Sequence, residues 1–153
     1  MRRYLDELGL PKHDVHYDMP RIRRLAIEAI AAMNDEELAA AADAPVEVVP
    51  ALRGARDLTE AHDYARQVLE PEPVSLGEEA RPTLERFKEL RERAGNGLDH
   101  DGARELVREL KAVGGDLRSL RLALTGRERG PELWAIVAAL PPEEALRRID
   151  AAL

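Results

Sequence analysis

Residues 121–133, which read RLALTGRERGPEL, combine basic side chains with the glycines and the proline of a turn. Gly126 suits the left-handed position just past the end of a helix, and Pro131 suits the first position of a new one. The N–H groups that open this new helix would lie beside Arg127 and Arg129. Such a corner can receive a phosphate or the edge of an exposed nucleobase. The alternative is an ordinary connection between two helices, with its arginines in water.

A second stretch with possible binding chemistry is 52–60 (LRGARDLTE), which carries Arg53 and Arg56. Asp57 and Glu60 have the spacing of a helix cap, so the two arginines stand just before an expected helix. The alternative to a binding role is a capped helix start with two solvated arginines.

The remaining polar residues indicate neither catalysis nor a metal site. The chain has no cysteine, which excludes disulfides, thiolate zinc sites and cysteine nucleophiles. Its four histidines are scattered, and His13 and His16 fall in an expected loop beside Pro11. Acidic clusters such as 35–37 fall in first turns of predicted helices, where the helix dipole explains them. A nucleophile elbow and a Walker loop are both absent from the sequence, so we expect no catalytic residue.

Charge is distributed unevenly along this acidic chain of 153 residues and net charge −7. Residues 31–80 hold three arginines and twelve acidic residues, whereas residues 117–131 hold four arginines and one glutamate. The acidic total argues against a general nucleic-acid binder, but a basic corner on an acidic body fits a selective contact. No apolar run approaches the length of a membrane span and no signal peptide opens the chain, so we expect a soluble, cytoplasmic protein.

Helical periodicity runs through most of the chain, and its composition is rich in helix-forming Ala, Leu, Glu and Arg. Residues 44–50 between two prolines predict an ordered connection, with a short strand as the alternative. Pro71 and Pro73 break the helical pattern, which predicts two subdomains, residues 1–70 and 77–153. The expected helices cover 4–12, 20–33 with a buried face from Ile22 to Met33, 34–42 behind an Asn34–Glu37 capping box, 57–69, 84–94, 103–113, 117–125, 131–140 and 142–153.

From Leu120 to its C-terminus the sequence resembles the C-terminal signature of bacterial-type glutamyl-tRNA synthetases. Their LxxALTGxxxxPxL-like segment is matched at 120–133, and their arginine-containing final helix by EEALRRI at 143–149. A weaker similarity reaches back to Tyr4, whose YLDELGLP segment resembles one that lies just after the catalytic half. The resemblance implies an all-α fold of the class I synthetase anticodon-binding type with two small helical-bundle subdomains. Residues 1–70 would be the connecting, stem-contact and first anticodon-binding part, and 77–153 the C-terminal one.

The resemblance also assigns roles to residues of the corner. Arg121 matches the base-contacting arginine that precedes the ALTG run. Gly130, Pro131 and Leu133 match the residues that enclose the anticodon bases, although Gly130 replaces a threonine of some members and so lacks a hydroxyl contact. Trp134 stands at an aromatic position of the family, and we expect it in the core rather than as a stacking platform.

The stretch 52–60 fits its family counterpart, an Arg/Lys–Thr–Leu–x–Glu segment, only in part. Arg56, Leu58 and Glu60 match, but Asp57 stands where threonine is usual and Gly54 where arginine is usual. The register of Arg53 and Arg56 as RNA contacts therefore stays open.

The resemblance implies an RNA-binding function without chemistry of its own. The expected partners are the anticodon loop of tRNA-Glu and the catalytic half of a glutamyl-tRNA synthetase, whether the chain is excised or separately encoded. HIGH-like and KMSKS-like motifs are absent, so ATP and magnesium would belong to that half and no cofactor to this chain. Whether tRNA-Gln is also accepted stays open. The alternative is a stand-alone helical protein-interaction module on the same scaffold.

Overall fold

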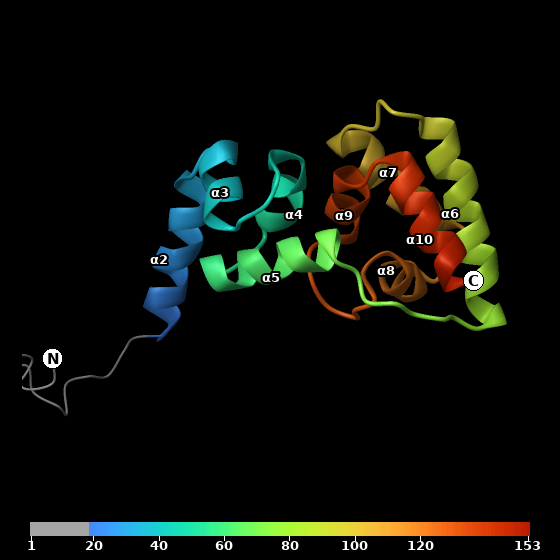
Figure 1. Cartoon of the computed structure of the whole chain (residues 1–153), viewed down its shortest axis with the longest axis horizontal. Helices are drawn as coiled ribbons and strands as arrows, with labels where there is room; N and C mark the ends of the chain where they lie inside the picture. The colour runs from blue at the N-terminus through green and yellow to red at the C-terminus, as the bar shows by residue number, and fades with distance from the viewer. Residues whose placement is uncertain (1–18) are drawn as a thin grey trace, which may run out of the picture.

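The computed structural model describes residues 19–153, and every regular element in that range is a helix (Figure 1). The predicted all-α class is therefore confirmed, while the helix predicted over 4–12 lies outside the described residues. In chain order the elements are α2 (Met19–Ala32), α3 (Asp35–Ala41), the 3₁₀ turn η2 (Val46–Val48), α4 (Val49–Leu52), α5 (Leu58–Leu69), η3 (Glu78–Ala80), α6 (Arg81–Ala94), α7 (His100–Ala112), α8 (Leu117–Thr125), α9 (Leu133–Ala139) and α10 (Pro142–Ala152).

The helices form two neighbouring groups, α2–α5 and α6–α10, joined by the non-helical segment 70–77 (Figure 1). That segment is pinned to the second group by its backbone. The N–H of Glu72 donates to the carbonyl of Thr125 at 3.1 Å, and the N–H of Leu76 donates to that of Ala152 at 2.9 Å. The groups also meet directly, because α4 packs on α9 and α5 on α8. The division into subdomains at 70–77 stays a prediction.

Side-chain caps begin the helices where the sequence predicts them. Asn34 and Glu37 form the expected capping box at α3. Asp57 accepts from the N–H of Glu60 at 2.7 Å, and Asp116 accepts from that of Ser119 at 3.1 Å. These bonds satisfy N–H groups that have no partner inside a helix, so they fix where α3, α5 and α8 start.

Two predictions in the first half of the chain are wrong. Helix α2 does not bury the expected face, since Ile22 is 41% exposed and Leu25 is 53% exposed, whereas Ile30 near its end is buried. Among the described residues, Ile30 of α2 belongs to the core, and Met33 just after the helix packs against it. The segment 44–50, predicted as an extended connection or a short strand, is helical from Val46 onward: η2 leads into α4, and Pro50 lies in the first turn of α4, where proline loses no needed N–H.

The predicted start of the helix after the corner is also wrong by two residues. Helix α9 begins at Leu133 rather than at Pro131. Glu132 has an extended backbone, with φ −59° and ψ 141°, and its carbonyl accepts the first bonds of the helix from Ala135 and Ile136. Pro131 therefore belongs to the turn, and its carbonyl is free to accept a side-chain donor.

Apolar side chains from both groups of helices build the core. The largest fully buried ones include Leu38, Leu52, Phe87, Leu120, Leu124, Ile136 and Ile149. The spacing of these residues along α8 and α9 fixes the faces that these helices turn inward, and so fixes the loop between them. Within residues 19–153, no helix has the length and apolarity that crossing a membrane would require.

Candidate nucleic-acid interface

The turn after α8 is built around Thr125, whose side chain is fully buried. Its hydroxyl donates to the carbonyl of Arg121 at 3.1 Å and accepts from the N–H of Arg127 at 3.2 Å. Gly126 follows with φ +76°, the left-handed conformation predicted for the position past the helix end. We call residues 126–133 the corner. The hydrogen bonds of Thr125 and the left-handed conformation of Gly126 together fix how the chain leaves α8 and enters the corner.

Gly126 also lets the 70–77 segment approach the corner closely. A Cβ at this position would lie 2.3 Å from the backbone oxygen of Glu72. No side chain fits there without movement of the Glu72 backbone, which the bond to Thr125 holds in place. The corner is therefore tied to the junction of the two helix groups.

Arg121 is half-buried and holds the far side of the corner. Its Nη1 donates to the carbonyl of Pro131 at 2.5 Å. Burial lowers the pKa of Arg121, and the phenol of Tyr64 on α5 opposes that shift. The guanidinium thus lies at the corner, as predicted, but one of its donors is used to position the turn before α9.

The other arginines of this region differ in their availability. Arg127 pairs with Glu72 at 2.9 Å, and Arg118 pairs with Glu128. Arg129 is exposed and makes no ion pair or hydrogen bond with any residue that the structure describes. Exposed ion pairs are weak, so an incoming phosphate could take over Arg127, but Arg129 is available without such an exchange.

The other residues predicted at the corner determine the course of its backbone and do not offer exposed side chains. Pro131 and Leu133 are buried. Gly130 lies against Gln67 of α5, because a Cβ on Gly130 would be 2.1 Å from Gln67 Oε1. That buried oxygen has no hydrogen-bond partner among the described residues, while Nε2 of the same side chain donates to Asp63 at 3.0 Å. Sequence reasoning missed Gln67, since only the fold brings α5 to the corner.

Arg53 has a structural task at the end of α2. Its Nη1 donates to the carbonyls of Ile30 at 3.0 Å and Met33 at 2.8 Å, and its Nη2 donates to Asp35 at 2.6 Å. The side chain therefore satisfies carbonyls that the helix leaves open.

Arg56 is exposed and pairs with Glu60, with 2.7 Å between Nη2 and Oε2. The hydrogen bond from Arg56 lowers the pKa of Glu60, against the effect of burial. Two causes raise the pKa of the neighbouring Tyr64. Burial is the larger, and the hydrogen bond to Glu60 is the second. The phenol of Tyr64 also raises the pKa of Arg121, against the larger effect of burial.

The fold brings parts of the two predicted stretches to one pocket of about 430 Å³, which lies between α4 on one side and α7 and α9 on the other. We call it the Trp134 pocket. Arg53 and Gly54 line it from the first group of helices, and Glu132 and Trp134 from the second. The remaining lining residues are His100 and Arg104 of α7, together with Pro50 and Ala51 of α4.

Trp134 only partly fits the prediction of a core side chain. It is half-buried and packs against the core. The guanidinium carbon of Arg104 lies 3.9 Å from the centroid of its ring, and the ring of His100 lies at 5.6 Å with a 55° tilt. Its indole N–H donates to Glu132. His100 and Arg104 were not predicted, because no spacing links them to Trp134 before the helices pack.

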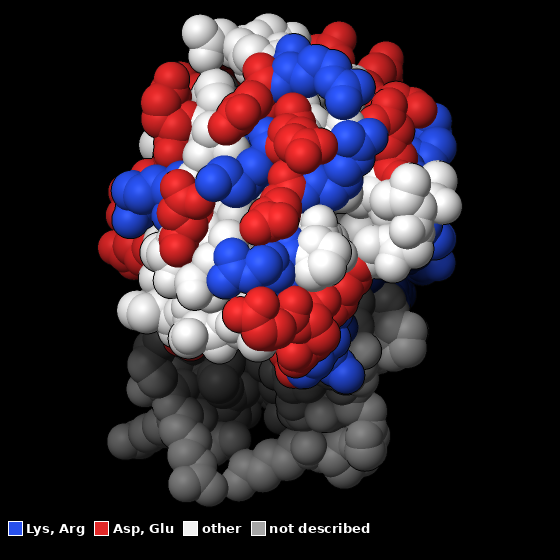
Figure 2. All heavy atoms as spheres, turned by 90° about the vertical axis from the view of Figure 1, so that its right-hand side faces the viewer, with Lys and Arg blue, Asp and Glu red and all other residues white. Residues whose placement is uncertain are grey.

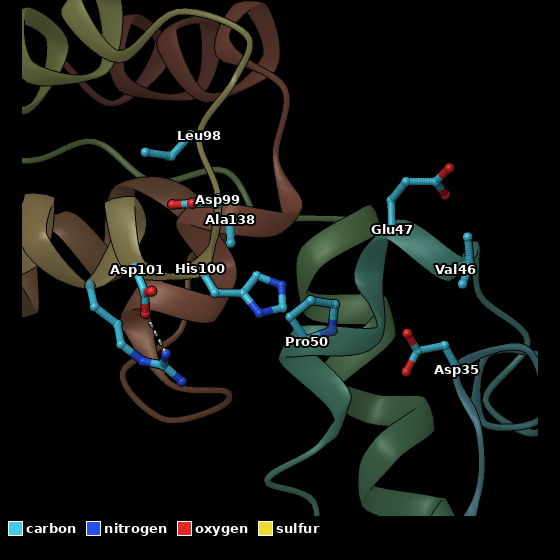
Figure 3. A pocket seen from close by; sticks show the side chains of 10 residues that line it. Asp35, Val46, Glu47, Pro50, Leu98, Asp99, His100, Asp101 and Ala138 are labelled. Carbon is cyan, nitrogen blue, oxygen red and sulfur yellow. Dashed lines mark hydrogen bonds and ion pairs between the residues drawn. The ribbon is translucent and has the colours of Figure 1, made fainter.

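A larger neighbouring pocket, of about 730 Å³, continues past His100, whose ring points towards Pro50 (Figure 3). Its lining includes four carboxylates, from Asp35, Glu47, Asp99 and Asp101. Within residues 19–153, however, no three Asp, Glu or His side chains are grouped as a metal site would need. Negative charge makes this pocket a poor place for a phosphate.

The face over α6 and α10 has no continuous basic area. Lysine and arginine alternate there with aspartate and glutamate (Figure 2). Lys88 pairs with Asp150 at 2.6 Å across the two helices, and Arg86 pairs with Glu89 at 2.9 Å along α6. Such a face offers an RNA backbone little net attraction, which leaves the corner as the better candidate.

Most of the chain is similar to known proteins. The family described as "Anticodon binding domain" matches residues 24–153, which include the corner and the 52–60 stretch. A glutamate–tRNA ligase of Caulobacter vibrioides is 32% identical over 149 residues, covering 89% of this chain and 32% of that protein. The chain therefore spans about a third of the length of this relative.

Proposed function

Because the chain belongs to the anticodon-binding domain family, we propose that it binds the anticodon loop of tRNA-Glu and positions that tRNA for aminoacylation. It would act with the catalytic half of a glutamate–tRNA ligase, in the cytoplasm. ATP and magnesium would bind to that half, since the HIGH-like and KMSKS-like motifs are absent from this sequence.

One observation supports the proposal: Arg53 and Gly54, from one stretch that resembles an anticodon-contacting segment, and Glu132, from the other, line the same pocket. The two stretches are separated by about sixty residues in sequence, so their meeting is a product of the fold. Unpaired bases expose their edges and faces, which arginine and backbone groups can read. Arg129 and Arg127 of the corner would hold the phosphates, and Arg121 would hold the turn before α9. No contact among the described residues favours the interaction-module alternative.

The proposed function predicts a preference for one anticodon. The unmutated chain should bind tRNA-Glu about 5- to 150-fold more tightly than the same tRNA with all three anticodon bases exchanged, because one or two base contacts contribute about 1–3 kcal/mol. Fluorescence anisotropy with end-labelled tRNA measures both affinities. A tRNA-Glu altered only in its acceptor stem is the control and should bind like the native one. Equal affinity for all three RNAs would leave the proposal without support.

Arg129 and Arg121 should respond differently to substitution. Arg129→Ala removes an exposed cation without an ion pair among the described residues, so it should weaken binding to all tRNAs alike and reduce the salt dependence by about one unit. Arg121→Ala should reduce the anticodon preference, with a loss of about 1–3 kcal/mol on tRNA-Glu. It should also lower stability by about 1–2 kcal/mol, since the carbonyl of Pro131 loses its partner. Anisotropy at two salt concentrations and a melting curve for each variant separate these effects.

The control for charge is Arg93→Ala, which removes an exposed arginine of α6 that has no ion pair within residues 19–153. It should leave both anticodon preference and stability unchanged. If Arg121→Ala melts earlier but keeps the full preference for tRNA-Glu, Arg121 is a structural brace and not a base contact.

A further inference from the structure

We propose that the Trp134 pocket binds one unstacked nucleobase of the RNA loop, with Arg104 of α7 as the surface on which that base stacks. This inference rests on the proposed function and adds a third segment, α7, to the two that resemble known contacts. The pocket is of suitable size, since small-molecule sites begin at about 300 Å³.

Arg104 is arranged to present a flat cationic surface. The guanidinium carbon lies over the Trp134 ring, 3.9 Å from the ring centroid. Its ion pair with Asp101 is long, at 3.4 Å, and the Arg104 side chain is 47% exposed. Arg104 also lines the Trp134 pocket, so the exposed part of its side chain can contact a base bound there. Bases stack on such planes without a need for a particular sequence.

The opposite side of the pocket is rigid and leaves room. Arg53 is fixed by its bonds to the end of α2 and to Asp35, so it is part of the wall rather than a mobile arm. Gly54 has no atom within 4 Å of where its Cβ would be. The segment 50–54 thus closes one side of the pocket without filling it.

The charge of the surroundings favours a base over a phosphate. Four carboxylates line the neighbouring larger pocket, so a nucleotide backbone that entered there would be repelled. Glu132 lies at the rim, where its carboxylate accepts from the indole of Trp134. A base is uncharged and can pass between these groups, while its phosphates remain near Arg129 outside. We therefore assign the base to the pocket and the backbone to the corner.

The test compares two arginines of α7 that each form an ion pair within that helix. Arg104 pairs with Asp101 and Arg108 pairs with Glu105, both three residues earlier, but only Arg104 lines the pocket. With a hairpin RNA that carries the tRNA-Glu anticodon loop, Arg104→Ala should weaken binding about 5- to 100-fold, and Arg108→Ala less than about threefold. Arg104→Lys keeps the charge without the plane, so it should lose nearly as much as Arg104→Ala.

A second readout locates the loss. Each hairpin of a set lacks the base of one loop nucleotide. At one position the abasic hairpin should bind the unmutated chain weakly, and Arg104→Ala should not weaken the binding of that hairpin further. Trp134 is the sole tryptophan of the chain, so its fluorescence reports directly on this pocket and should change when the intact hairpin binds.

The outcomes separate the two proposals. If the unmutated chain binds the hairpin but Arg104→Ala and Arg108→Ala lose affinity equally, or Arg104→Lys binds normally, the base pocket is refuted while the proposed function stands. If the unmutated chain binds this hairpin no better than one with a scrambled loop, the proposed function fails and the pocket proposal fails with it.

Discussion

Replacing Glu144 by glutamine is expected to lower the free energy of unfolding at pH 7 by about 2 kcal/mol. Glu144 accepts from Arg147 and from Arg148, and the Arg148 side chain is only 5% exposed. The hydrogen bond from Arg147 is the largest cause that lowers the pKa of Glu144, to about 2. Such a shift corresponds to at most about 3 kcal/mol, which we reduce because a third of the side chain is in water.

The lowered pKa of Glu144 also predicts how the stability of the chain depends on pH. The pKa of Glu144 is lower in the folded chain than its ordinary value of 4.5, so its contribution is complete above pH 4.5 and is lost as the pH falls towards 2. The difference between the unmutated chain and Glu144→Gln should therefore shrink over that range. Urea unfolding at about pH 7, 4.5 and 3 measures it, and at pH 7 the melting temperature should fall by about 4–8 °C.

Glu89→Gln is the matched control for this experiment. Glu89 also pairs with an arginine three residues away in its helix, but both partners are exposed, so we expect a change below about 1 kcal/mol. Equal losses from the two substitutions would contradict a role for the buried Arg148. That role concerns the corner, because Arg148 Nη1 also donates to the carbonyl of Leu124, one residue before Thr125.

Local signals in the sequence are sufficient to predict a structural feature wherever a residue stabilises the helix next to it in sequence. Asp57 and Asp116 cap the helices that follow them, and Gly126 takes the left-handed conformation after α8. These features depend on neighbours three or four residues away, so spacing alone predicts them. The approximate extent of α5, α6, α7 and α10 follows from apolar periodicity for the same reason.

Contacts between distant segments cannot be predicted in this way. The periodicity of α2 indicates a buried face, but burial requires a partner, and among residues 19–153 the large side chains of Ile22 and Leu25 stay exposed while Ile30 is buried. The family resemblance predicts Arg53 as an RNA contact, yet the described chain itself offers it three acceptors about twenty residues away. Whether RNA contacts Arg53 or the other predicted site residues stays a prediction.

The Trp134 pocket also depends on contacts between segments that are distant in sequence. Arg53 and Gly54 come from one predicted stretch, and Glu132 and Trp134 lie at or beside the other, but their adjacency depends on how α4 packs on α9. His100 and Arg104 then enter because α7 also packs on α9. The candidate residues follow from the sequence and the family resemblance, whereas the site they form depends on tertiary packing.

Within the corner, substitution of Gly126 should lower the stability of the chain most. We expect Gly126→Ala to lower the free energy of unfolding by about 3 kcal/mol, from two separate causes. A left-handed conformation costs an alanine about 1–2 kcal/mol. The new Cβ would also be 2.3 Å from the Glu72 oxygen, and crowding of this kind costs a further ~1–3 kcal/mol.

Gly114→Ala separates these two causes. Gly114 has the same φ of +76°, but no atom lies within 4 Å of its would-be Cβ. Only the conformational cost applies there, so we expect a loss of about 1–2 kcal/mol. Urea unfolding of both variants gives the difference, which measures the close approach of the 70–77 segment to the corner.

Hydrogen exchange tests whether this approach fixes the segment. The N–H of Glu72 donates to the carbonyl of Thr125, directly before Gly126. A Cβ on residue 126 must push the Glu72 backbone away, so this amide should exchange faster in Gly126→Ala than in the unmutated chain, and at an unchanged rate in Gly114→Ala once global stability is accounted for. Equal stability losses with unchanged exchange at Glu72 would mean that the segment yields without breaking its bond. In that case the corner would be positioned by Thr125, Arg121 and Arg148 alone.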